Sequence, residues 1–118
     1  MVPSAAGSVV LVPFPFSDLT QAKLRPAVVL ADAGRGDWIL SQITSKPYGD
    51  PQAVELVERN FRSGSLRIVS YVRPGKLFTA NNSLVVGEVG VLTDEALHQI
   101  VGAVIRILRG AGSIEQQP

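Results

Sequence analysis

Arginines and hydroxyl side chains are the residues of this sequence best suited to chemistry on a phosphate. Arg25 stands at the mouth of an apolar run, directly before Pro26, while Thr44 and Ser45 end another apolar run. An arginine keeps its proton and presents a planar fork of donors that binds and neutralises phosphate. Pro26 restricts the backbone of Arg25 to extended conformations, which would aim its side chain. The two segments therefore predict a phosphate-binding cleft.

Each of these residues also has a purely structural explanation. Arg25 can form an ion pair with Asp18 or Asp32, and a Thr-Ser pair at the end of a strand can simply cap the backbone. Asp18 lies in the polar loop before Arg25, where it is a candidate base, a loop anchor or a partner of Lys23. The residues alone leave these alternatives open.

Several other classes of site have no support in the sequence. There is no cysteine, no glycine-rich phosphate loop and no cluster of ligands with metal spacing. The single histidine, His98, follows Asp94 and Glu95 and is expected on the solvated face of a helix. Residues 1–8 do not look like a signal peptide, and no apolar run approaches the roughly 20 residues of a membrane helix. These absences are compatible with a cytoplasmic protein, which we expect, and they give no support for a bound metal or cofactor.

A local basic stripe stands out in a chain whose formal net charge is only +1. No acid interrupts its five cations, which are Arg59, Arg62, Arg67, Arg73 and Lys76. A strand over Leu66–Val72, continued to Arg73, would place Arg67, Tyr71 and Arg73 on one face. Cations for phosphates and an aromatic ring for base stacking are typical of a single-strand-binding surface. The alternative is an ordinary solvated sheet face.

The predicted elements are short strands followed by one helix. Helical spacing of apolar residues predicts a helix that Thr93 caps and Gly110 ends, whose apolar stripe is a core or dimer contact. Turns are expected at 34–37, at "RNFRSGS" and at "RPGK". This pattern predicts a small, strongly bent sheet or partly open barrel in a single domain over 1–110, with a disordered tail at 111–118. Strands are expected at Ser8–Val12, Pro26–Leu30, Trp38–Thr44, Ala53–Val57, Leu66–Val72 and Leu77–Thr79.

Four segments, taken in order, resemble the PemK/MazF family of toxin endoribonucleases. They are "GSVVLVPFPFSDLTQAKLRPAVVLAD", "ILSQITS", "SYVRPGKLFT" and "VVGEVGVLT". The resemblance covers roughly Gly7 to Leu108, and its most specific part is the Arg-Pro segment with the loop before it. It implies an SH3-like, partly open β-barrel with a C-terminal helix, in a mainly β (α+β) fold that is usually a homodimer.

The resemblance also implies an activity. Family members cut single-stranded RNA without a metal, by attack of the 2′-hydroxyl, and leave a 2′,3′-cyclic phosphate and a 5′-hydroxyl. An antitoxin protein blocks their RNA groove. The family's catalytic pair corresponds to Arg25 and Thr44, whereas Gly75 stands where some members carry an aspartate after the arginine matched by Arg73. The expected RNA-binding residues are Asp18, Lys23, Ser45, Arg67, Tyr71, Arg73 and Lys76.

Two other functions stay open at this point. Toxins with the same barrel poison DNA gyrase by binding it, without catalysis of their own. A barrel that binds RNA or an antitoxin but has lost its activity is the other alternative, which the glycine at position 75 keeps open. Arg25 and Thr44 favour the endoribonuclease, because a gyrase binder does not need that pair.

Overall fold

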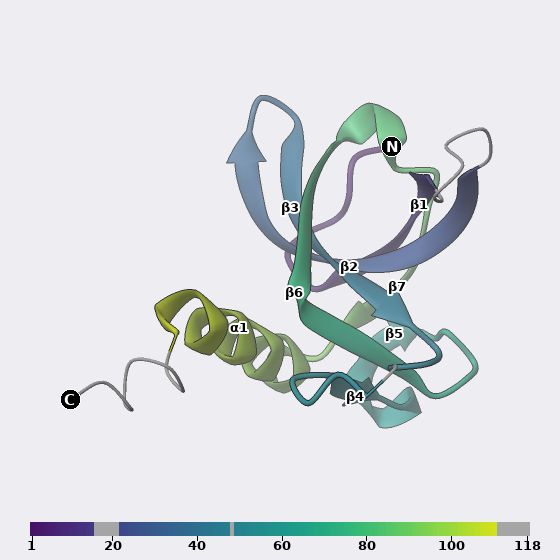
Figure 1. The fold of residues 1–118 in the computed structure, drawn as a ribbon. Helices are drawn as coiled ribbons and strands as arrows, with labels where there is room; N and C mark the ends of the chain where they lie inside the picture. Colours follow the sequence, from purple (N-terminus) through teal and green to yellow (C-terminus); the bar gives the residue numbers. More distant parts are fainter. Residues whose placement is uncertain (16–21, 48, 111–118) are drawn as a thin grey trace.

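The chain forms one strongly curled antiparallel sheet and a C-terminal helix (Figure 1). The computed structural model of the protein describes residues 1–15, 22–47 and 49–110. Across the sheet the strand order is β4-β6-β3-β2-β1-β7-β5. The elements are β1 (Ser8–Pro15), β2 (Ala22–Gly34), β3 (Asp37–Thr44), β4 (Val54–Leu56), the 3₁₀ turn η1 (Glu58–Asn60), β5 (Phe61–Gly64), β6 (Ser70–Asn81), the 3₁₀ turn η2 (Asn82–Leu84), β7 (Gly87–Leu92) and α1 (Asp94–Arg109).

Helix α1 begins and ends where the sequence predicts. The Thr93 hydroxyl accepts a hydrogen bond from the Ala96 N–H at 3.2 Å, and Gly110 ends the helix in the left-handed conformation with φ +61°. Ile100 is fully buried, whereas Leu108 in the last turn is 72% exposed. The apolar stripe therefore supplies core contacts only in its earlier turns. No helix in the described ranges is long and apolar enough to span a membrane.

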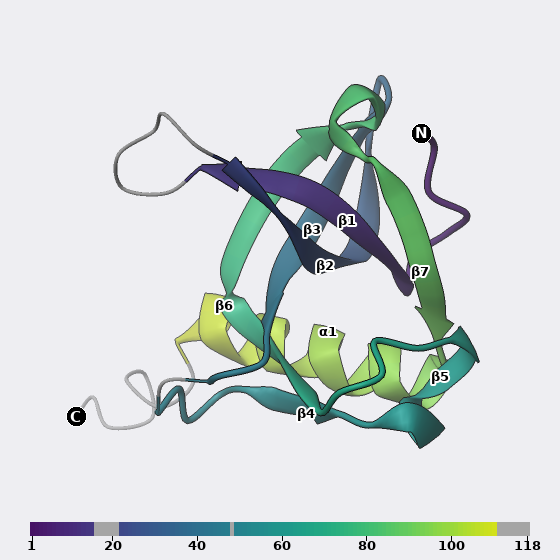
Figure 2. The same cartoon turned by 90° about the vertical axis from the view of Figure 1, so that its right-hand side faces the viewer.

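Two hydrophobic cores lie on opposite faces of the central strands. The helix-side core packs α1 against one face, where Val28 of β2 and Ile43 of β3 meet Ile100. The inner core occupies part of the hollow of the curled sheet and contains Val29 of β2 and Leu40 of β3. In Figure 2, α1 runs along the lower part of the view, beneath β1, β2 and β3. Because the middle of β2, from Ala27 to Val29, is buried on both faces, its sequence there is a continuous apolar run instead of an alternating one.

The turn predicted at "RPGK" is wrong, because β6 runs through that segment. Its pairing with β3 shifts there: Gln42 lies opposite Arg73, whereas the preceding Ser41 lies opposite Leu77. The extra residues form a bulge that accommodates Pro74, which has no N–H to donate to the ladder. The Ser41 hydroxyl donates to the Arg73 carbonyl at 2.6 Å. Strand β6 bends sharply at this level in Figure 1.

The strand predicted over Leu66–Val72 is also wrong in its first half. Residues 65–69 form an irregular loop, and β6 starts only at Ser70. Gly64 ends β5 with φ +69°, and the Ser65 hydroxyl then accepts a hydrogen bond from the Arg67 N–H at 2.8 Å. These local contacts curl the chain and hold Arg67 at φ +68°. The "RNFRSGS" segment, predicted as a turn, instead contains η1 and the edge strand β5, which pairs with β7.

Candidate active site

The end of β3 positions Thr44. Ile43 belongs to the helix-side core, so the alternation of the strand turns Thr44 to the opposite face, where it is half-buried. The Thr44 hydroxyl donates to the Lys46 carbonyl and accepts from the Lys46 N–H, both at 3.1 Å. These two bonds fold the chain back directly after the strand. They fix the hydroxyl and leave one of its oxygen lone pairs unused by Lys46.

Strand β2 brings Arg25 to the same row. Arg25 pairs with Val12 of β1, and two residues later Ala27 pairs with Gln42 of β3. The β2–β3 pairing ends at that pair, and Arg25 and Thr44 are the next residues of the same face, two residues beyond it on each strand. Arg25 is half-buried. The two residues that the sequence singles out for chemistry therefore continue the same face of two adjacent strands, just beyond the last β2–β3 pair.

Tyr71 completes this row from the other side. It lies directly opposite Thr44 in the β3–β6 ladder and is half-buried. We call Arg25, Thr44 and Tyr71 the polar row. The next pair along the same face is Gln42 and Arg73, because side chains two residues apart on a strand share a face. The prediction that Tyr71 and Arg73 share a face is confirmed.

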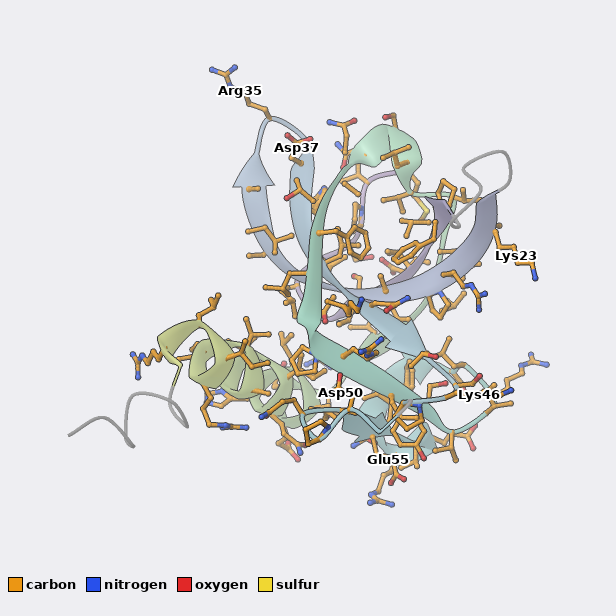
Figure 3. The ribbon with its side chains drawn as sticks, viewed as in Figure 1. Lys23, Arg35, Asp37, Lys46, Asp50 and Glu55 are labelled. Atoms are coloured by element: carbon orange, nitrogen blue, oxygen red, sulfur yellow. The ribbon has the colours of Figure 1, made fainter. Side chains whose placement is uncertain are left out.

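A half-buried ion pair fixes Arg73. Its Nε atom donates to the Asp50 carboxylate at 3.0 Å, and the two side chains are only 24% and 13% exposed. Asp50 comes from the loop between β3 and β4, which Figure 3 shows beside β6. The backbone N–H of Gln52 and the charges of Arg73 and Lys76 lower the pKa of Asp50, against the opposing effect of burial. Asp50 is therefore an anion at neutral pH and a weak base.

We expect Asp50→Asn to lower the free energy of unfolding by about 1–3 kcal/mol near pH 7. The pKa of Asp50 is depressed in the folded state from its ordinary value of 3.8, so the carboxylate stabilises the fold above that value. This contribution should be lost as pH falls below about 5 towards the lowered pKa. Urea unfolding of both proteins at several pH values measures the difference.

The exposed ion pair between Arg62 and Asp94 provides the control. Its side chains are 58% and 91% exposed, although the two charged atoms lie 2.6 Å apart. Solvent screens such a pair, so Arg62→Gln should cost less than about 1 kcal/mol. Equal losses in Asp50→Asn and Arg62→Gln would contradict the structural role given to the Asp50–Arg73 pair.

The structure places the other predicted RNA-binding residues in different parts of the molecule. Lys23, Ser45 and Lys76 are exposed on β2, directly after β3 and in the β6 bulge. Figure 3 shows Lys23 projecting from the molecule on the side where Lys46 also lies. The predicted place of Arg67 on the strand face is wrong. The loop at 65–69 removes Arg67 from that face and places it in a cleft that Phe61 and Val89 also line. Asp18 lies outside the described residues.

The structural alternative of an Arg25–Asp32 pair is not supported. Asp32 lies near the other end of β2, about 20 Å along the strand from Arg25, and its carboxylate accepts the Gly34 N–H at 2.7 Å. The expectation for His98 is confirmed, since it is exposed on α1. Within the described ranges, no three side chains among His, Cys, Asp and Glu gather closely enough to hold a metal ion.

Two site residues, Gln42 and Asp50, were missed at the sequence level. Gln42 carried a usable signal, because it lies two residues before Thr44 and therefore shares its face on a strand. Asp50 carried none, because its contact with Arg73 joins a loop to a strand 23 residues further along the chain. Only the folded chain shows that pair.

Comparisons with known proteins place these features in context. Residues 5–108 match the family model described as PemK-like, MazF-like toxin of type II toxin-antitoxin system. No curated protein matches the sequence significantly. A MazE–MazF structure from Deinococcus radiodurans is similar with TM-score 0.72 and 23% identity, covering 92% of this chain and 97% of that one.

A second solved structure is an endoribonuclease in complex with its cognate antitoxin from a mycobacterial species. It matches with TM-score 0.68 and 15% identity, over 92% of this chain and 96% of that one. At these identities the similarity establishes the fold. The expected fold, a partly open barrel of strands with a C-terminal helix, is confirmed.

Proposed function

The chain belongs to the PemK-like, MazF-like toxins of type II toxin–antitoxin systems, and on this premise we propose that it is an endoribonuclease that cleaves single-stranded RNA without a metal. The observation that supports the proposal is the polar row: Thr44 and Tyr71 pair across β3 and β6, and Arg25 continues the same face on β2, two residues beyond the last β2–β3 pair. The row combines a guanidinium, an oriented hydroxyl and an aromatic ring. These groups suit a phosphate, a ribose and a base respectively.

In the proposed reaction the ribose 2′-oxygen attacks the adjacent phosphorus. A P–O2′ bond forms and the P–O5′ bond breaks, which leaves a 2′,3′-cyclic phosphate and a 5′-hydroxyl. The proton of the 2′-hydroxyl is removed, and the departing 5′-oxygen gains one. Arg25 neutralises the negative charge that grows on the phosphorane, the kind of interaction that usually contributes most to catalysis.

Thr44 is proposed to orient the nucleophile. Its hydroxyl proton is already donated to Lys46, so the remaining lone pair can accept a hydrogen bond from the 2′-hydroxyl. Neither Arg25 nor Thr44 is a base near pH 7. We therefore attribute much of the rate to in-line positioning of the 2′-oxygen and the leaving oxygen.

The remaining groups are proposed to hold the RNA strand. Tyr71 stacks on a base, and Lys23, Ser45, Arg73 and Lys76 contact phosphates or sugars. Support comes from their placement on or beside the face that carries the polar row. Asp18 and Arg67 keep their proposed RNA contacts from the sequence alone: Asp18 from its place in the loop before Arg25, and Arg67 from its charge in the basic stripe. For Arg67 such a contact would lie in the cleft beside Phe61 and Val89, away from the strand face.

An antitoxin partner, a homodimer and a cytoplasmic location are further parts of the proposal. Support for an antitoxin comes from the similar structures, some of which contain one. Support for a dimer comes from the last turns of α1, where Ile105 and Leu108 are 40% and 72% exposed. Apolar side chains at such exposure suit a contact with a second chain.

Incubation of the purified protein with a long single-stranded RNA in EDTA tests the function. We expect cuts at discrete sequences whose upstream fragments end in a cyclic phosphate, because the attacking group belongs to the RNA itself. A gyrase supercoiling assay run in parallel covers the alternative from the same fold. Intact RNA together with inhibited gyrase would overturn the endoribonuclease proposal.

A further inference from the structure

A cleft of about 430 Å³ opens on the face that carries the polar row. It is the hollow of the curled sheet that the inner core leaves unfilled. Most of its wall is apolar, and its polar groups are Gln42, Lys76 and Thr79. The remaining lining residues come from β1, β6 and η2, and they are Val12, Pro13, Phe14, Leu77, Phe78, Ala80 and Leu84.

Aromatic rings form part of this wall. The rings of Phe14 and Phe78 meet edge to face, with centroids 4.8 Å apart and planes at 85°. This contact holds both rings in place. Flat apolar surfaces of this kind accept the faces of nucleobases, and proteins that read single-stranded RNA stack splayed bases on aromatic side chains.

Gln42 joins the cleft to the polar row. It lines the cleft and precedes Thr44 by two residues on the same face of β3, a separation of about 7 Å along the strand. A base on a ribose held at Thr44 can therefore reach the cleft. A glutamine amide offers both donors and an acceptor, which is what reading the edge of a base requires.

We propose that this cleft binds a nucleobase next to the scissile phosphate, and that Gln42 determines which base is accepted. The inference rests on the proposed endoribonuclease function and adds a specificity pocket to it. Lys76, exposed in the β6 bulge at the rim, supplies a positive charge for a neighbouring phosphate. The apolar wall of the cleft suits the face of a base, the Gln42 amide suits its edge, and the Lys76 charge suits the phosphate.

Nuclear magnetic resonance with uncleavable RNA tests occupancy of the cleft. The probes are 2′-O-methyl octamers of A, C or U and one mixed-sequence octamer, which lack the attacking hydroxyl. We expect resonances of the Phe14 and Phe78 rings and of the Gln42 amide to shift, by amounts that depend on the base. Shifts confined to the polar row and its loops, with the cleft unaffected, would overturn the inference.

Two variants test selection of the base. Gln42→Leu should reduce the ratio of affinities for the preferred and disfavoured octamers about tenfold or more. Leu84→Trp, at a position that is 47% exposed on the cleft lining, should weaken binding of every octamer by filling the entrance. The matched control is Gln99→Leu, which changes an exposed glutamine on α1.

Failure of this inference can be separated from failure of the proposed function. Because the octamers cannot be cut, their binding is measured whether or not the protein is a nuclease. Cleavage of ordinary RNA combined with an unresponsive cleft would refute the pocket alone. If thermal unfolding shows that both proteins are folded, identical base preferences of wild type and Gln42→Leu would refute the role of Gln42.

Discussion

Replacement of Arg25 by alanine is expected to lower the rate of RNA cleavage by roughly 10²–10³-fold or more. The loss follows from the position of Arg25 in the polar row, where its guanidinium can neutralise the phosphorane while Thr44 holds the nucleophile. Single-turnover cleavage of a short RNA with one mapped site, in EDTA, measures this effect. Single-turnover conditions exclude product release from the comparison.

Arg25→Lys separates charge from geometry. Lysine keeps the positive charge but loses the planar fork that binds two phosphate oxygens at once. Its rate should fall between those of wild type and Arg25→Ala. A lysine variant as slow as the alanine variant would assign most of the effect to bidentate contact.

Arg35→Ala is the matched control for the arginine series. Arg35 is exposed at the tip of the β2–β3 hairpin, where Figure 3 shows it pointing away from the rest of the molecule. Its removal changes the net charge by the same amount as Arg25→Ala and should leave cleavage unchanged. If the cleavage rate of Arg25→Ala lies within about threefold of the rate of Arg35→Ala, Arg25 is not a catalytic residue.

Elements with local signals could be predicted from the sequence. The cap at Thr93, the apolar spacing and the stop at Gly110 all lie within α1 or beside it, so its bounds were correct. The central strands were also recognised, because each contains a buried stretch of mainly apolar residues, such as Ala27–Val29. Their true lengths could not be predicted: β2 runs over Ala22–Gly34, well beyond the apolar run at Pro26–Leu30.

Elements that depend on distant partners could not be predicted. The segment "RPGK" has the composition of a turn, yet the ladder to β3 carries β6 through it and absorbs Pro74 in a bulge. The edge strand β5 exists because β7 pairs with it, although β5 contains only four residues, Phe61–Gly64. Local sequence carries no information about such pairing.

The candidate site shows the same division. Arg25 and Thr44 could be selected by residue type and by their places near strand ends, and the fold then puts them on one face of two adjacent strands. The partner of Arg73 could not be selected, because Asp50 reaches it only through the path of the β3–β4 loop. Residue chemistry is local, whereas the contacts that tune it are long-range.

Gly64→Ala is expected to destabilise the protein by roughly 3 kcal/mol or more. Gly64 ends β5 with φ +69°, a conformation that costs about 1–2 kcal/mol for an alanine. A Cβ atom there would also lie 2.1 Å from the Val89 carbonyl oxygen and 2.6 Å from the Gly90 Cα. Both atoms belong to the backbone of β7, so relief requires the edge strand to move away.

Gly49→Ala isolates the conformational part of this cost. Gly49 has a similar φ of +72°, but a Cβ atom at that position would meet no atom within 4 Å. Its replacement should therefore cost only the 1–2 kcal/mol of left-handed strain. Urea unfolding of both variants gives the difference that close packing of β5 on β7 contributes. If both variants lose the same free energy of unfolding, the clash at Gly64 is relieved at no cost. The pairing of Phe61 and Ser63 with β7 is then enough to hold β5.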